Sequence, residues 1–425
     1  MTELTYRSKR LGEQYSVTRH KSGMTLLFYP MPSFRSAYVS VTARIGSVDC
    51  AYRSDGAADF TRLPDGVAHF LEHKLFENED GDAFAKYART GASANAYTSF
   101  SQTSYLFSTT DHFREALDIL LGFVTQPYFT ADSVAKEQGI IGQEIGMYDD
   151  DPDWQSYNGV LGALYQRFPL NRDIAGSRAS IAEITAPLLY DCYHAFYNPH
   201  NLTLTAAGRF DPAVILDACD RLVPETPPVA VQGPAYDEPA GVAERRVERR
   251  MAISLPVFTI GFKERALPPE QLTLRALYTE ILLDMLVSDV SSFYRKLYDA
   301  QLINDSFSHE VMTCRGQWLS LFSGESRDPD AVFAALCETF DAARRQGLDR
   351  KAFARSRRAI YGRLMKSFDN VEAAASTILE YHFANVCVYD IIEKIATVSF
   401  EEIAALLDEV LRGENAALSV VLPNE

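Results

Sequence analysis

The spacing of apolar residues divides the first half of the chain into short strands and longer helices. An apolar run at Met24–Tyr29 and an alternation at Tyr38–Ile45 predict two strands, separated by the turn residues Pro30–Ser33. Further along, segments with the period of a strand alternate with segments that have helical spacing. The other elements expected in this half are strands at 103–108 and 202–207 and helices at 66–76, 111–124, 131–148 and 211–222.

A proline-rich segment at residues 224–241 interrupts this pattern. It holds five prolines and few large apolar residues, which predicts a linker without a packed core: Pro224, Pro227, Pro228, Pro234 and Pro239. The pattern then restarts, with strands expected at 252–262, 319–324 and 417–422 and helices at 269–286, 329–346 and 350–368. The sequence therefore predicts two related α+β domains, at 1–223 and 242–425.

Length and composition agree with two soluble domains. The chain of 425 residues exceeds the size at which one core stops growing, and 47% hydrophobic with 23% charged residues is ordinary for globular protein. We expect a cytoplasmic location, because no apolar run reaches about 20 residues and Met1–Val17 lacks an apolar signal segment. The net charge of −16 argues against nucleic acid as a partner.

Two histidines four residues apart carry the first candidate chemistry. His69 and His73 lie in a predicted helix, where residues four apart share one face. Two imidazoles at this spacing form a preorganised pair for zinc. Glu72 lies at the edge of the same face, where a carboxylate can reach a metal-activated water; this is the inverted H-x-x-E-H arrangement. The alternative is a pair of surface histidines on an ordinary helix.

The helix expected at 131–148 offers carboxylates for a third metal ligand. Glu137 and Glu144 lie two turns apart and share a face with Val134, Ile141 and Ile145. Carboxylates are seldom fully buried unless they are paired or bind metal. The alternative is a half-exposed face on which both glutamates are solvated.

These residues resemble the pitrilysin/insulinase family of zinc peptidases, in its short two-domain branch. That family follows H-x-x-E-H by E-x-x-x-x-x-x-E some seventy residues later, and His69, Glu72, His73, Glu137 and Glu144 match both parts. The resemblance implies one zinc per chain bound by His69, His73 and Glu144. It implies that Glu72 is the catalytic base. It also implies that Glu137 supports catalysis from behind the metal ligands. The implied fold is two domains, each a mostly antiparallel sheet covered by helices.

The resemblance extends to a segment that would hold substrate. Residues 91–105 are similar to the family's edge strand, so Asn95, Ala96 and Tyr97 are expected to bind the backbone of an extended peptide. Residues 197–208 are similar to the end of the family's first domain. The expected activity is zinc-dependent hydrolysis of extended peptides inside an enclosed chamber.

The second half departs from the family pattern at two positions. Active members often carry an Arg and a Tyr in this region, whereas here Tyr298 stands in place of the Arg and Asn304 or Asp305 near the place of the Tyr. We therefore expect a heterodimer with a related chain that lacks zinc but carries both residues, or otherwise a homodimer. Two further alternatives are a non-catalytic scaffold subunit, as in processing-peptidase-like assemblies, and a zinc-bearing module that binds peptides without cutting them.

Overall fold

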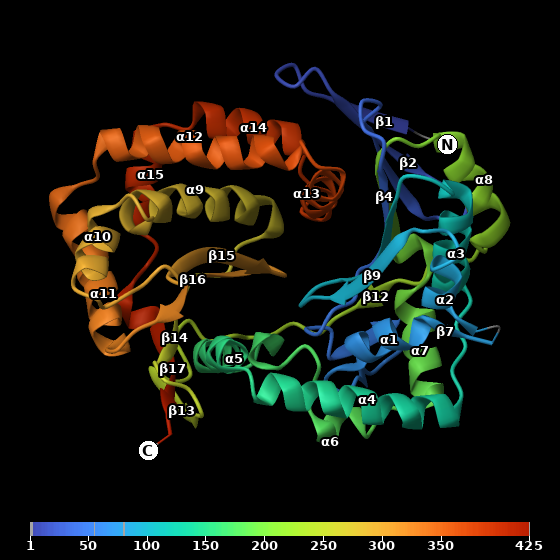
Figure 1. The fold of residues 1–425 in the computed structure, drawn as a ribbon, viewed down its shortest axis with the longest axis horizontal. Coiled ribbons are helices and arrows are strands. Elements are labelled where there is room, and N and C mark those ends of the chain that lie inside the picture. The colour runs from blue at the N-terminus through green and yellow to red at the C-terminus, as the bar shows by residue number, and fades with distance from the viewer. Residues whose placement is uncertain (1–2, 55, 80, 425) are drawn as a thin grey trace.

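The computed structural model describes residues 3–54, 56–79 and 81–424. Two sheets occupy opposite halves of the molecule (Figure 1). The first sheet has seven strands in the order β1 (Glu3–Arg7), β2 (Gln14–Arg19), β3 (Thr25–Pro30), β11 (Leu202–Gly208), β4 (Ala37–Ala43), β10 (Thr103–Thr109) and β9 (Ser93–Thr98). The second has five, in the order β13 (Arg246–Met251), β17 (Ala416–Pro423), β14 (Val257–Lys263), β16 (Gln317–Glu325) and β15 (Ser308–Cys314).

The two sheets repeat one topology. In the first, β11 pairs in parallel with β3 and antiparallel with β4; in the second, β17 pairs in parallel with β13 and antiparallel with β14. The outer hairpins β10–β9 and β16–β15 also correspond, which leaves β9 and β15 as edge strands. The predicted pair of related α+β domains with mostly antiparallel sheets is confirmed. The exact domain boundaries stay a prediction.

The helices of each half pack on its sheet and on one another. Those of the first half are α1 (Val67–Leu75), α2 (Ala83–Tyr87), α3 (Phe113–Thr125), α4 (Ala131–Asp149), α6 (Arg178–Ile181), α7 (Ala186–Phe196) and α8 (Pro212–Leu222). Those of the second are α9 (Pro269–Val287), α10 (Ser292–Asp299), α11 (Pro329–Gln346), α12 (Arg350–Ser367) and α15 (Phe400–Leu407). Short ladders join β5 (Ala51–Ser54) to β6 (Thr61–Arg62) and β12 (Val231–Gln232), and β7 (Glu77–Asn78) to β8 (Gly81–Asp82).

Each sheet is also covered by helices from the other half of the chain. α5 (Pro152–Leu164) packs on β14 and β17 of the second sheet, with Val160 and Leu161 buried against Leu319 and Leu321. In return, α13 (Val371–Phe383) packs on β3, β4 and β11 of the first sheet, and α14 (Val388–Thr397) lies beside it. The exchange is visible in Figure 1, where α5 lies beside the second sheet and α13 lies between the halves. It ties the halves together through apolar cores.

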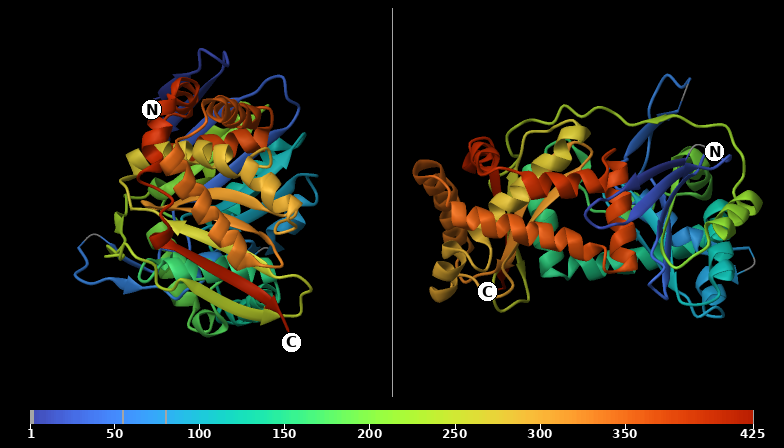
Figure 2. Two further views of the ribbon diagram at one scale, coloured as in Figure 1. Left: turned by 90° about the vertical axis from the view of Figure 1, so that its left-hand side faces the viewer. Right: turned by 90° about the horizontal axis from the view of Figure 1, so that it is seen from above.

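One expectation from the sequence is corrected. The strand expected at 252–262 begins only at Val257, because residues 252–256 form a loop that ends in Pro256, whose nitrogen cannot donate to a ladder. The proline-rich segment crosses between the halves (Figure 2), and part of it is anchored to the second half. Glu238 pairs with the buried Lys263, whose ammonium also donates to the carbonyls of Pro239 (2.7 Å) and Leu164 (3.0 Å). No helix in the described ranges is long and apolar enough to cross a membrane.

Candidate metal centre and peptide-binding edge

The start of α1 is fixed by a close contact with the segment that precedes α6. Gly66 precedes the helix at φ 89°, and a Cβ there would overlap the carbonyl oxygen of Ala175. Gly176 has φ 73°, and a Cβ there would overlap the carbonyl oxygen of Asp65. Both positions require glycine, for the backbone conformation and for the close approach. This double contact determines where the first turn of α1 lies.

Three side chains from α1 and α4 converge on one point. His69 and His73 have ring centroids 4.6 Å apart, and both direct Nε2 towards the Glu144 carboxylate. His69 Nε2 lies 3.6 Å from Oε1, and His73 Nε2 lies 3.5 Å from Oε2. One ligand atom from each of the three residues lies within 4.8 Å of the others. The structure therefore brings together the three residues expected to bind zinc.

The spacing and bonding of these atoms fit a zinc ion. Ligands about 2.0–2.1 Å from a tetrahedral ion lie about 3.4 Å from one another, close to the distances at Glu144. His69 Nε2 lies 3.6 Å from Glu144, too far for a hydrogen bond but a separation that a shared ion would bridge. Burial and the charge of His73 lower the pKa of His69 to about 4, so the imidazole is neutral and its lone pair is available.

Glu137 orients the second histidine. Nδ1 of His73 donates a hydrogen bond to Glu137 Oε1 at 3.0 Å, which leaves the lone pair of Nε2 facing Glu144. Burial alone would raise the pKa of Glu137, but the hydrogen bond from His73 and the charges of His73 and Lys74 lower it. For His73, burial would lower the pKa, and its carboxylate neighbours raise it. Glu137 therefore fits a supporting role behind a ligand.

Glu72 lies beside the three converging residues and is held by a strand residue. Its Oε2 accepts a hydrogen bond from Thr98 Oγ1 at 2.7 Å, at the end of β9. Burial raises the pKa of the Glu72 carboxyl, and the Thr98 hydrogen bond opposes that rise. Oε1 accepts no hydrogen bond from the residues that the structure describes, so this oxygen remains for a proton-transfer role. The assignments of His69, His73 and Glu144 as ligands and of Glu72 as base stay predictions.

The predicted substrate-binding residues lie on the edge strand β9. Asn95 and Tyr97 are exposed, and Ala96 is half-buried. β10 occupies one side of β9, and no strand within the described ranges pairs with the other side, which is therefore an open sheet edge. Asn95 Oδ1 accepts the backbone N–H of Ala96 at 2.9 Å. Because Thr98 also contacts Glu72, a peptide paired with β9 would pass the metal centre.

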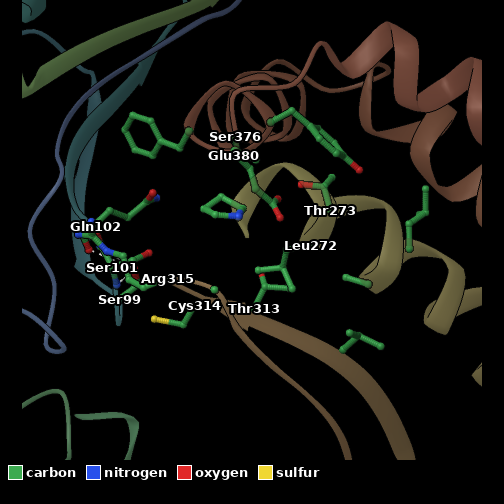
Figure 3. Close-up of a pocket in the computed structure, with 18 of the residues that line it drawn as sticks. Ser99, Ser101, Gln102, Leu272, Thr273, Thr313, Cys314, Arg315, Ser376 and Glu380 are labelled. Carbon is green, nitrogen blue, oxygen red and sulfur yellow. Dashed lines mark hydrogen bonds between the residues drawn. The ribbon is translucent and has the colours of Figure 1, made fainter. Parts of the chain in front are cut away.

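A cavity of about 530 Å³ continues from the end of β9 towards the second half. Figure 3 shows Gln102 and Ser99 on one side and Thr273 and Glu380 on the other. Arg315 also lines this cavity; its guanidinium lies 3.0 Å from the carboxylate of Asp49 and donates to the carbonyl of Ser101 at 3.2 Å. Residues of both halves therefore line the surface beside the end of β9.

Sequence reasoning missed two polar contacts of the centre. Thr98 belongs to the predicted strand segment, but nothing in the sequence indicates its hydrogen bond to Glu72. Tyr148 follows Glu144 by four residues on α4, and its hydroxyl donates to Glu144 Oε1 at 2.7 Å. In the second half, Tyr298 lies on α10, is 50% exposed and stacks on Tyr294 with centroids 5.8 Å apart.

Comparison with known proteins places the chain among peptidases. Residues 55–178 match the family Insulinase (Peptidase family M16), and residues 183–360 match the peptidase M16 inactive domain. The uncharacterized zinc protease YmfH of Bacillus subtilis is 32% identical over 422 residues, covering 98% of both chains. An uncharacterized zinc protease of Rickettsia felis is 28% identical over 217 residues, half of each chain.

A solved structure supports the same relationship over nearly the whole chain. An M16-like peptidase from Alicyclobacillus acidocaldarius superposes with a TM-score of 0.92 at 34% identity, covering 96% of this chain and 98% of that one. A protease from Helicobacter pylori, at 14% identity and a TM-score of 0.83, shows the same fold. With its two sheets of one topology and its H-x-x-E-H helix, the chain belongs to the insulinase family of peptidases, family M16.

Proposed function

We propose that this chain is a zinc-dependent endopeptidase that hydrolyses extended peptides, with one zinc ion per chain. The observation that carries the proposal is the convergence of His69, His73 and Glu144, with Glu72 beside them and held by a separate bond. The names of the relatives, zinc proteases, agree with a peptidase role. A scaffold subunit has no need of this complete set.

The residues of the site would have two tasks, binding the metal ion and transferring a proton. His69 and His73 through Nε2, and Glu144 through a carboxylate oxygen, would hold the ion, with Glu137 fixing the tautomer of His73. A zinc ion held there would act as a Lewis acid, which would acidify water and polarise a peptide carbonyl. Glu72 would accept the proton of the attacking water at Oε1 and deliver it to the leaving amine, while Thr98 holds Oε2.

The free edge of β9 supports an extended substrate. A peptide that adds a strand there is recognised by its backbone, so unfolded segments are favoured over particular side chains. Asn95, Ala96 and Tyr97 would line this strand, and the cavity beyond Thr98 gives room for residues on one side of the scissile bond. A chamber formed between the halves would admit extended peptides and exclude folded proteins.

We infer further that the active form includes a related chain without zinc ligands. Tyr298 and the 304–305 segment replace the Arg and Tyr that the family uses to hold substrate, and a partner could supply both. Groups that stabilise developing charge often account for a large share of catalysis. The test compares peptide hydrolysis by the purified chain alone and with a candidate partner. Full activity of the chain alone, unchanged by partners, would remove this inference.

The proposed activity is tested with an internally quenched, unstructured peptide. The zinc-loaded chain, together with its partner where one is required, should cleave it, lose activity on chelation, and regain activity when zinc is restored. A chain that binds zinc and peptide but cleaves nothing, alone or with a partner, would instead be a peptide-binding module.

A further inference from the structure

The carboxylate of Glu144 is held by a tyrosine on its own helix. Tyr148 lies one turn further along α4, and its hydroxyl donates to Glu144 Oε1 at 2.7 Å. That oxygen is the one 3.6 Å from His69 Nε2, while Oε2 faces His73. A glutamate side chain loses considerable rotamer freedom when it is fixed. The hydrogen bond from Tyr148 restricts the rotation of this carboxylate before metal binds. Less rotational freedom is then lost on binding.

Tyr148 is in turn held by the first turn of α5. The ring of Trp154 stacks on the ring of Tyr148, with centroids 4.8 Å apart and an interplanar angle of 23°. Trp154 Nε1 donates to Asp173 Oδ2 at 2.7 Å, and the same oxygen accepts from Asn158 Nδ2 at 2.9 Å. Asp173 Oδ1 accepts the backbone N–H of Ala175 at 2.9 Å. The stacking partner of Tyr148 is therefore itself fixed.

The backbone of Tyr148 is tied to the second half as well. Its carbonyl accepts a hydrogen bond from Gln155 Nε2 at 2.8 Å, and Gln155 is bonded by Arg249 of β13. α5, which carries Trp154 and Gln155, packs on the second sheet (Figure 1). Asp173 lies in the segment whose Ala175 and Gly176 contact the start of α1. One set of contacts thus connects both helices of the metal centre to the second half.

We propose that Tyr148 is a positioning residue for Glu144, and that Trp154 fixes Tyr148 so that α5 sets the geometry of the metal centre. This inference rests on the proposed function, because it requires a metal ion at the three converging residues. Groups that hydrogen-bond to a metal ligand typically contribute about 10–100-fold in metal affinity. A single hydrogen bond from a neutral hydroxyl to a carboxylate lies within that range.

The test measures zinc affinity of the full chain by competition with a chromophoric chelator. Tyr148→Phe keeps the ring and its stacking but removes the hydroxyl, and we expect zinc binding weakened about 10-fold or more. Tyr294→Phe is the matched control: Tyr294 is also half-buried and stacked on an aromatic ring, and its hydroxyl donates one hydrogen bond, to the Asn304 carbonyl at 3.3 Å. It should bind zinc as the wild type does.

Two further readouts separate positioning from general damage. Cobalt(II) absorption, which depends on coordination geometry, should change in Tyr148→Phe and not in Tyr294→Phe, while the unfolding temperature of the metal-free chains stays similar. Trp154→Phe keeps a ring but loses the bond to Asp173, so its zinc affinity should fall between the wild type and Tyr148→Phe. The double variant should bind within about twofold of Tyr148→Phe, because Trp154 acts through Tyr148.

The outcomes distinguish this inference from the function on which it rests. A wild-type chain that binds no zinc overturns both. If the wild type binds zinc and Tyr148→Phe has the same zinc affinity and cobalt spectrum, only the role of Tyr148 is overturned. If the fold-losses in zinc affinity of the two single variants multiply in the double variant, Trp154 does not act through Tyr148.

Discussion

Replacing Thr98 by valine tests whether the orientation of Glu72 matters for turnover. Thr98 donates the hydrogen bond that the structure gives to Glu72 Oε2, at 2.7 Å. Valine has nearly the same shape and favours strands, so β9 should keep its pairing with β10. The change therefore removes one hydroxyl and leaves Oε2 without its donor.

The size of the effect follows from the nature of this bond. Hydrogen bonds to charged groups contribute about 1.5–3 kcal/mol, and each 1.4 kcal/mol lost from the transition state slows the reaction about tenfold. Glu72 is half-buried, so water can partly replace the hydroxyl. We therefore expect the lower end, a fall of about 10-fold in kcat/KM. Zinc affinity should not change, because the hydroxyl contacts none of the three converging residues.

The assay is hydrolysis of the quenched peptide at full zinc loading. Thr205→Val is the control: Thr205 lies in β11 of the same sheet, and its buried hydroxyl has no partner among the described residues. That variant should keep wild-type kcat/KM. Wild-type kcat/KM in Thr98→Val, with zinc content equal, would refute the reasoning that Thr98 holds the base.

Three further changes test other parts of the account. Glu144→Gln should lose most of its bound zinc by metal analysis, and undiminished zinc would remove Glu144 from the ligand set. Glu137→Gln should lower zinc affinity or rate by about 10–100-fold, and no change in either would remove its supporting role behind His73. Burial raises the pKa of Glu264 to about 7, although the backbone N–H of Leu411 opposes this. Because the folded pKa lies above the ordinary value of 4.5, this group's stabilising contribution is complete below pH 4.5 and is lost as the pH rises towards and past 7. Glu264→Gln should then unfold with up to about 3 kcal/mol more free energy than the wild type at pH 8, and equal denaturation curves there would contradict the shift.

The parts of the site that the sequence predicted are those encoded by local spacing. His69 and His73 share a face because they lie four apart on one helix, and Glu137 and Glu144 share a face two turns apart. These relations depend only on helix geometry. The pairing of His73 with Glu137 and the approach of Thr98 to Glu72 depend on how α1 packs on α4 and β9, which no single-segment pattern contains.

The exchange of α5 and α13 was not predicted for a similar reason. An amphipathic helix shows in its sequence that one face is buried, but not which sheet buries it. The sequence therefore indicated two similar halves, while the structure shows that each depends on a helix from the other. β14 begins at Val257 and not at residue 252 because Pro256 cannot donate to a ladder. The prediction rested on apolar periodicity, which does not take a proline into account.

The most direct test of the central claim is a parallel measurement of zinc content and peptide hydrolysis in the wild type and Glu72→Gln. Because Glu72 moves a proton and does not hold the ion, the variant should keep wild-type zinc and lose about 10²–10⁴-fold in turnover. Wild-type turnover in Glu72→Gln, or loss of zinc together with turnover, would contradict the assignment of Glu72 as the base beside a zinc site of His69, His73 and Glu144.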